Sequence, residues 1–94
     1  MPKKRTVGRT ERAIQIAAAI GETLREARAA AGITQADVAG AVGVSRQLYA
    51  DMEAGKTALR MDQLDGIARA VGVTPWTLVR RSLDLMAASP VAGD

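Results

Sequence analysis

The chain has 94 residues, which is enough for one domain, and its composition excludes several classes of protein. It contains no cysteine and no histidine, so it lacks disulfides, thiolate chemistry, the usual soft metal ligands and the commonest general base. One Trp and one Tyr are the only aromatic residues, so the core must be built from Ala, Val, Leu, Ile and Met. This alanine-rich composition predicts an all-α fold. The absence of cysteine fits a reducing cytoplasm.

The net charge of +3 comes from the N-terminus. Residues 1–12 carry five basic side chains against one acidic, a balance of +4, whereas residues 13–94 carry eight against nine, a balance of −1. We therefore expect residues 1–10 to form a flexible basic arm. Two interpretations stay open, a solubilising tail or an arm that contacts DNA. The candidate contacts are Lys3, Lys4, Arg5 and Arg9.

A first helix is predicted from about residue 11 to residue 31, with Gly32 ending it. Its inward stripe is expected to be Ile16, Ile20, Leu24 and Ala27. A basic start followed by apolar residues also resembles a secretory signal, but the apolar part is short, contains a glutamine and continues in phase along the helix. No stretch approaches the roughly 18 apolar residues of a membrane span.

Two short helices joined by a tight turn are predicted between residues 34 and 55. Thr34, with Asp37 three residues later, has the pattern of a capping box for a helix ending near Val42. Gly43 ends that helix in a left-handed conformation. Ser45 then caps a second helix that ends near Glu53.

The second of these helices has two different faces. Tyr49 and Met52 are expected to point inward, with the tyrosine hydroxyl reaching a hydrogen-bond partner. The other face carries a guanidinium, an amide, a small residue and a carboxylate, which are the donor and acceptor types that read base edges in the major groove. The carboxylate could accept from a cytosine amino group or neutralise the arginine in the free protein. These outward residues are Arg46, Gln47, Ala50 and Asp51.

Four short segments carry a resemblance to a known family. They are Gly32-Ile33-Thr34-Gln35, Val44-Ser45-Arg46, Met52-Glu53-Ala54-Gly55-Lys56 and Val71-Gly72-Val73. With their spacing, they resemble the Xre/Cro-type helix-turn-helix proteins of the lambda-repressor-like fold, over about residues 20–78. The resemblance implies a five-helix all-α domain that binds DNA, with the helix-turn-helix at helices 2 and 3. We expect this domain to span residues 11–88, followed by a disordered tail at 89–94.

The resemblance also implies roles for individual residues. Gln35 would hold a phosphate and brace the recognition helix, and Arg28 would form an ion pair with Glu53. Two departures stand out, because Ala54 replaces an asparagine that the family often uses on the DNA backbone, and Arg60 replaces a helix-capping serine. The expected backbone contacts are Gln35, Ser45, Lys56, Thr57 and Arg60.

Two further helices are predicted after the motif. One spans residues 61–71 with an inward face of Met61, Leu64, Ile67, Ala68 and Val71, and Asp62 only partly replaces its missing cap. The other starts at Thr74-Pro75 and runs to about residue 87. Its inward stripe is expected to be Trp76, Val79 and Leu83. Apolar residues left outside that stripe indicate a homodimer contact: Leu78, Leu85 and Met86.

These features predict a sequence-specific, dimeric transcriptional regulator, a repressor or autoregulator that binds a palindromic double-stranded operator. We expect a bacterial or phage-encoded protein that lies in the cytoplasm and is associated with the nucleoid. We expect it to use no cofactor and no metal. The alternative is an antitoxin that binds a protein toxin and its own operator. An enzyme has almost no support, because Asp62 and Asp65 are more simply a solvated helix face.

Overall fold

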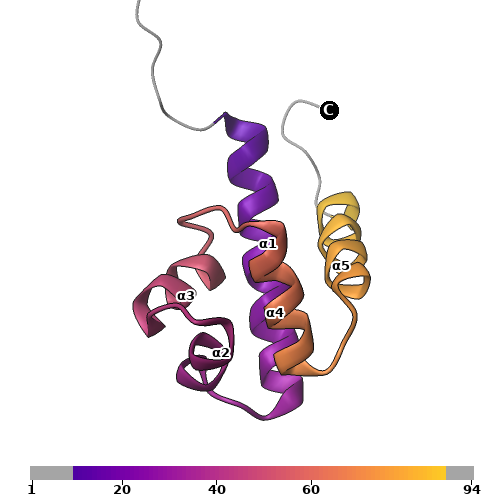
Figure 1. Cartoon of the computed structure of the whole chain (residues 1–94). Coiled ribbons are helices and arrows are strands. Elements are labelled where there is room, and N and C mark those ends of the chain that lie inside the picture. Colours follow the sequence, from indigo (N-terminus) through magenta and orange to yellow (C-terminus); the bar gives the residue numbers. More distant parts are fainter. Residues whose placement is uncertain (1–9, 89–94) are drawn as a thin grey trace, which may run out of the picture.

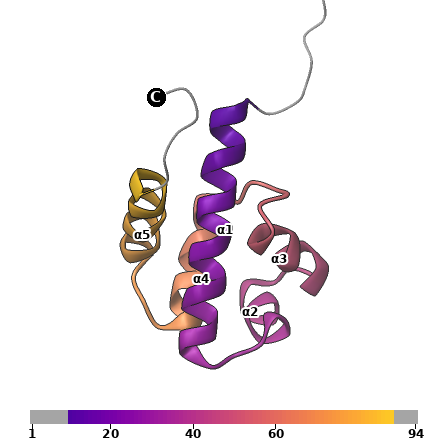
Figure 2. The same ribbon diagram turned by 180° about the vertical axis from the view of Figure 1, so that it is seen from behind.

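The computed structural model describes residues 10–88, which form five helices and no strands, as the all-α prediction requires. They are α1 (Glu11–Ala31), α2 (Gln35–Val42), α3 (Arg46–Glu53), α4 (Met61–Val71) and α5 (Pro75–Ala88). Figures 1 and 2 show α1 and α4 in the middle, with α2 and α3 on one side and α5 on the other. The α3 helix packs on α1 and α2, and α5 packs on α1 and α4.

The helix ends form where the local chemistry predicts them. The Thr34 hydroxyl accepts from the Asp37 backbone N–H at 3.0 Å, and the Asp37 carboxylate accepts from the Thr34 N–H at 3.0 Å, which completes the predicted capping box. These bonds hold the pKa of Asp37 below its ordinary value. Gly32, Gly43 and Gly72 end their helices in the left-handed conformation. Short-range rules therefore define most of the helix boundaries.

The start of α4 is held by a residue that the sequence did not single out. Arg60 makes no side-chain cap, but its backbone N–H donates to the Oε1 atom of Gln63 at 2.8 Å. Gln63 is buried although it is polar. The Arg60 guanidinium instead pairs with Asp62, at 2.9 Å between Nε and Oδ1. A buried glutamine thus supplies part of the cap that Asp62 was expected to supply.

The core lies among all five helices. Its fully buried large side chains come from all five helices, which explains how a chain this short holds together. They are Leu24, Val38, Tyr49, Met52, Ile67 and Leu78.

Of the predicted inward stripe of α5, Val79 packs against the core, but Trp76 and Leu83 do not, and Leu78, which was expected in the homodimer contact, is buried instead. Trp76 is 75% exposed and Leu83 is 59% exposed, whereas Leu78 is 1% exposed. The inward face of α5 is narrower than predicted and also contains Ser82, which is buried. A serine is tolerated there because its hydroxyl donates to the Leu78 carbonyl of the same helix at 2.8 Å and needs no other partner. The apolar residues outside the core are thus mainly Trp76 and Leu83, while Leu85 and Met86 are half-buried.

Two other inward assignments are also wrong, for a common reason. Ile16 is 38% exposed and Met61 is 77% exposed. Both residues lie in the early part of their helices, and Ala17 is the first buried residue of α1. The helical periodicity is correct there, but other elements do not cover those turns.

Two glycines allow a backbone-to-backbone contact between α1 and the end of α3. A Cβ at Gly21 would lie 2.3 Å from the carbonyl oxygen of Glu53, so a side chain there requires the backbone to move. Gly55, at φ +74, lies against the same helix one turn earlier, because a Cβ there would lie 3.1 Å from the Cα of Ala18. The end of α3 therefore rests directly on the α1 backbone.

We expect Gly21→Ala to lower the free energy of unfolding by about 1–3 kcal/mol, because the added methyl overpacks this contact. The matched control is Gly40→Ala in α2, where a Cβ meets nothing within 4 Å. That change should raise stability by about 0.5–1 kcal/mol, since it only removes the helical cost of glycine. Urea unfolding followed by circular dichroism measures both, and equal effects would contradict the contact.

Candidate nucleic-acid interface

The turn between α2 and α3 sets the angle at which α3 leaves the body. Gly43 has φ +83, and the Val44 N–H donates to the Ala39 carbonyl at 3.0 Å. Val44 is half-buried and packs against the core, and the Ser45 hydroxyl accepts from the Leu48 N–H at 3.0 Å. The turn is thus held by its backbone, by an apolar plug and by a cap at the start of α3.

The α3 helix has one face in the core and one outside. Tyr49 and Met52 are buried, and Arg46 and Gln47 are exposed. Ala50 and Asp51 are partly exposed. The four outward candidates therefore lie where the sequence placed them, on the side of α3 away from the core.

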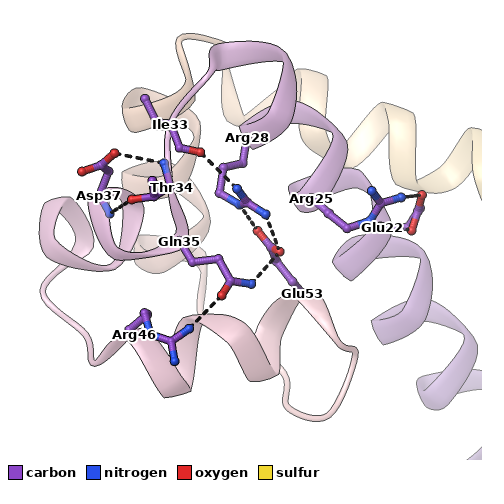
Figure 3. A network of polar contacts seen from close by, with 9 residues as sticks. All are labelled: Glu22, Arg25, Arg28, Ile33, Thr34, Gln35, Asp37, Arg46 and Glu53. Carbon is purple, nitrogen blue, oxygen red and sulfur yellow. Dashed lines mark hydrogen bonds and ion pairs between the residues drawn. The ribbon is translucent and has the colours of Figure 1, made fainter.

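An ion pair ties the end of α3 to α1. Arg28 Nε donates to Glu53 Oε2 at 2.6 Å, and Arg28 Nη2 lies 3.2 Å from Oε1 (Figure 3). The third guanidinium nitrogen donates to the Ile33 carbonyl at 3.0 Å. The Glu53 side chain is only 5% exposed. The pair that the family resemblance implied is therefore present, and it also holds the loop before α2.

Gln35 extends this network from the core to the surface. Its amide nitrogen donates to Glu53 Oε1 at 3.0 Å, and its amide oxygen accepts from Arg46 Nη1 at 3.1 Å (Figure 3). Because a carboxylate only accepts and a guanidinium only donates, the amide has one possible orientation between them. Glu53, at the inner end of α3, is thereby linked through α2 to Arg46, at the outer end.

Burial and neighbouring polar groups determine the direction in which the pKa values of Glu53 and Tyr49 shift. Burial alone would raise the pKa of Glu53, but hydrogen bonds from Arg28 and Gln35 outweigh it and lower the pKa below its ordinary value. Burial, with the nearby Glu53 carboxylate, raises the pKa of Tyr49. The Tyr49 hydroxyl is buried near Glu53, and no hydrogen bond of normal geometry joins it to a partner among residues 10–88.

Asp51 is engaged with its neighbour on the same helix. Gln47 Nε2 donates to Asp51 Oδ1 at 3.0 Å. Neutralisation of Arg46 by Asp51, one of the two roles considered from sequence, is not observed, because Arg46 bonds to Gln35 instead. The outward face of α3 thus carries two separate polar pairs rather than one ion pair.

The remaining candidates have mixed positions. Lys56 is exposed just after α3, where its backbone N–H donates to the Asp51 carbonyl at 2.9 Å. The Thr57 hydroxyl donates to the adjacent Ala58 carbonyl at 3.3 Å. Arg60 and Asp62 are both about 70% exposed, so their pair is open to solvent. Lys3, Lys4, Arg5 and Arg9 lie outside the described residues.

Two short helices joined by a glycine turn, with the second braced against the core and its polar face outward, define a helix-turn-helix protein. A family model described as "Helix-turn-helix domain" matches residues 19–82, and the chain belongs to that family. Comparison with curated protein sequences gives no significant match. Among the helices of residues 10–88, none has both the length and the apolarity needed to cross a membrane.

Solved structures agree with this assignment. The chain is similar to two crystal structures of the clp gene regulator ClgR from Corynebacterium glutamicum, with 26% sequence identity in each case. One has a TM-score of 0.74 and the match covers 77% of each chain. The other has a TM-score of 0.73, with 79% of this chain and 96% of that chain covered.

We expect Glu53→Ala to lower the free energy of unfolding by about 3–5 kcal/mol, because it leaves the Arg28 charge without its partner in a largely covered position. The control is Arg25→Ala, which removes the exposed pair with Glu22 on α1 and should change stability by less than about 1 kcal/mol. Urea unfolding at neutral pH measures both, and a small effect of Glu53→Ala would mean that the network does not hold α3.

Proposed function

We propose that the protein is a sequence-specific DNA-binding transcriptional regulator that inserts α3 into the major groove. The observation that supports this most strongly is the polar outward face of α3, carried on a helix whose position is set by a buried ion pair. A surface helix that only needed to be soluble would not require its last residue to be buried and bonded to two other segments. Direct readout requires a rigid helix, because base edges are recognised by side chains at fixed positions.

Arg46 and Gln47 are the proposed base-reading residues. The guanidinium suits the two acceptors of guanine, and an amide suits adenine. Arg46 is already tethered through Gln35, so less side-chain freedom is lost when it meets a base. Ala50 is small enough to let the helix approach the bases closely, and Asp51 completes the outward set.

The proposed backbone contacts surround that helix. After its bond to Glu53, Gln35 keeps one amide N–H that could donate to a phosphate. Ser45, Lys56, Thr57 and Arg60 flank the two ends of α3 and would meet the sugar-phosphate backbone. The basic residues before residue 10 would add further phosphate contacts, which matters because residues 13–94 carry a balance of −1.

The proposed functional unit is a homodimer through α5. The apolar stripe outside its buried face consists of Trp76 and Leu83, which are exposed, and the half-buried Met86, while Val79 packs against the core. Trp76 and Leu83 are seven residues apart, about two helical turns, so they lie on one side of α5, and a twofold axis would place two such stripes in contact. The stripe supports a second copy as the occupant, and α5 lies on the opposite side of α1 from α3 (Figure 1).

The proposed role is that of a repressor or autoregulator acting in the cytoplasm on a near-palindromic operator. The similarity to ClgR, whose name describes a gene regulator, supports regulation in general. An antitoxin is the second candidate, because the exposed α5 stripe would also suit a protein toxin. The two differ in the free protein, since the first requires a dimer through this stripe and the second leaves it open until the toxin binds.

We expect Arg46→Ala and Gln47→Ala each to weaken binding to the cognate site by about 1–3 kcal/mol and to relax preference at one base pair. The sites are obtained by selection from random double-stranded DNA, and affinities by fluorescence anisotropy. The control is Arg69→Ala, which removes an exposed arginine of α4 that pairs with Asp65. If both α3 variants kept the wild-type preferences, α3 would not be the recognition helix.

We expect Leu83→Glu to convert a dimer into a monomer, because it places a charge within the apolar stripe. The control is Ala88→Glu, which adds the same charge at another exposed position of α5. Analytical ultracentrifugation at micromolar concentration measures the mass. A wild-type monomer, or a Leu83→Glu dimer, would contradict this interface.

A further inference from the structure

The pair formed by Gln47 and Asp51 lies in the middle of the outward face of α3. The two residues are four apart on one helix, with Gln47 Nε2 donating to Asp51 Oδ1 at 3.0 Å. The orientation of the amide is fixed by chemistry, because the opposite orientation would place its oxygen against a carboxylate oxygen. An exposed pair of this kind contributes little to helix stability. The pair has a larger effect on which hydrogen-bond donors and acceptors of Gln47 stay available to contact DNA.

A free glutamine amide has two N–H donors and one acceptor oxygen. It can therefore satisfy guanine, which offers two acceptors at O6 and N7, by donating twice, or adenine by donating to N7 and accepting from N6. The bond to Asp51 uses one of the donors. What remains is one donor and one acceptor, which is the complement of adenine alone.

The Asp51 carboxylate adds an electrostatic preference in the same direction. It is the acidic group of the α3 outward face, and Arg46, the nearest basic candidate on that face, bonds to Gln35 instead. N7 is an acceptor in both purines, so the difference lies at position 6, where a carboxylate next to the amide repels the O6 acceptor of guanine and attracts the N6 amino group of adenine. The donor count and the charge therefore both favour a base with an amino group.

We infer that Asp51 is a specificity-determining residue that acts through Gln47, and that it makes this position of the half-site an adenine rather than a guanine. The inference rests on the proposed function, since it assumes that α3 enters the major groove. Asp51 here is a positioning residue. It removes the alternative way in which Gln47 would bind a base.

The test compares Asp51→Ala and Asp51→Asn with the wild type. The base pair read by Gln47 is first identified as the one whose preference disappears in Gln47→Ala, by selection from random DNA. Affinities are then measured on the cognate site with adenine or guanine at that base pair. The alanine variant loses both charge and acceptor, whereas the asparagine variant loses the charge but keeps an acceptor oxygen. Glu26→Gln, an exposed carboxylate on α1, controls for net charge.

We expect the wild type to prefer adenine over guanine by at least about tenfold, and Asp51→Ala to reduce that preference to below about threefold. Asp51→Asn should retain most of it, and Glu26→Gln all of it. Preference at the base pair read by Arg46 should be unchanged in every variant. This last readout separates specificity from a general gain of affinity, which removal of a negative charge gives on any DNA.

Several outcomes would overturn the inference. They are full adenine preference in Asp51→Ala, a loss of preference spread over all positions, and guanine at the Gln47 position in the wild type. If the wild type selects no sequence at all, the proposed function itself is wrong and the inference falls with it. That result differs from the others because it appears before any Asp51 variant is tested.

Discussion

A buried carboxylate is the constraint on which the arrangement of this domain depends. Glu53 is almost fully covered, and a carboxylate in that position is tolerated only if its oxygens are bonded. Its partners come from α1 and from the first residue of α2, and the arginine that neutralises it also binds the loop before α2. Satisfying one charged group therefore brings three helices together. The turn between α2 and α3 is then completed by Gly43, in the left-handed conformation, and by Val44, whose side chain packs against the core.

This constraint explains why the outer end of α3 is ordered as well as its inner end. Gln35 is the residue that converts a core interaction into a surface one, because its amide bonds to a carboxylate on one side and to a guanidinium on the other. A charged side chain at that position would satisfy only one of the two, and an apolar side chain would satisfy neither. The order of the polar side chains on the outward face of α3 thus depends on hydrogen bonds that reach it from the interior.

Much of the fold could be predicted from the sequence, because its signals are local. Thr34, Ser45 and Gly43 act within one helical turn of themselves, so the helix-turn-helix could be placed within a residue or two. The Arg28–Glu53 pair joins residues 25 apart and came from the family resemblance instead. Contacts of α3 with DNA remain predictions, since they depend on a partner that the chain alone does not contain.

The errors arise where a side chain's environment depends on how far another element extends. Trp76 and Leu83 have the periodicity of an inward stripe, but the packing of α5 on α1 and α4 buries Leu78 instead. The sequence could not show that a serine at position 82 would be accepted in the core through a bond to its own helix. The sequence around Gly21 carries no sign of the backbone contact, because that contact depends on where the end of α3 lies.

The contact at Gly21 has a consequence for how this protein can change over evolutionary time. The α3 helix is held by backbone atoms of α1 and by side chains on its inner face, and the outward residues take no part in that contact. Substitutions at those outward positions therefore change the outer surface of α3 with little change in the placement of the helix. Under the proposed function, a new DNA preference would arise by replacing Gln47 and its neighbours on the outer face, while the backbone contact at Gly21 stays the same.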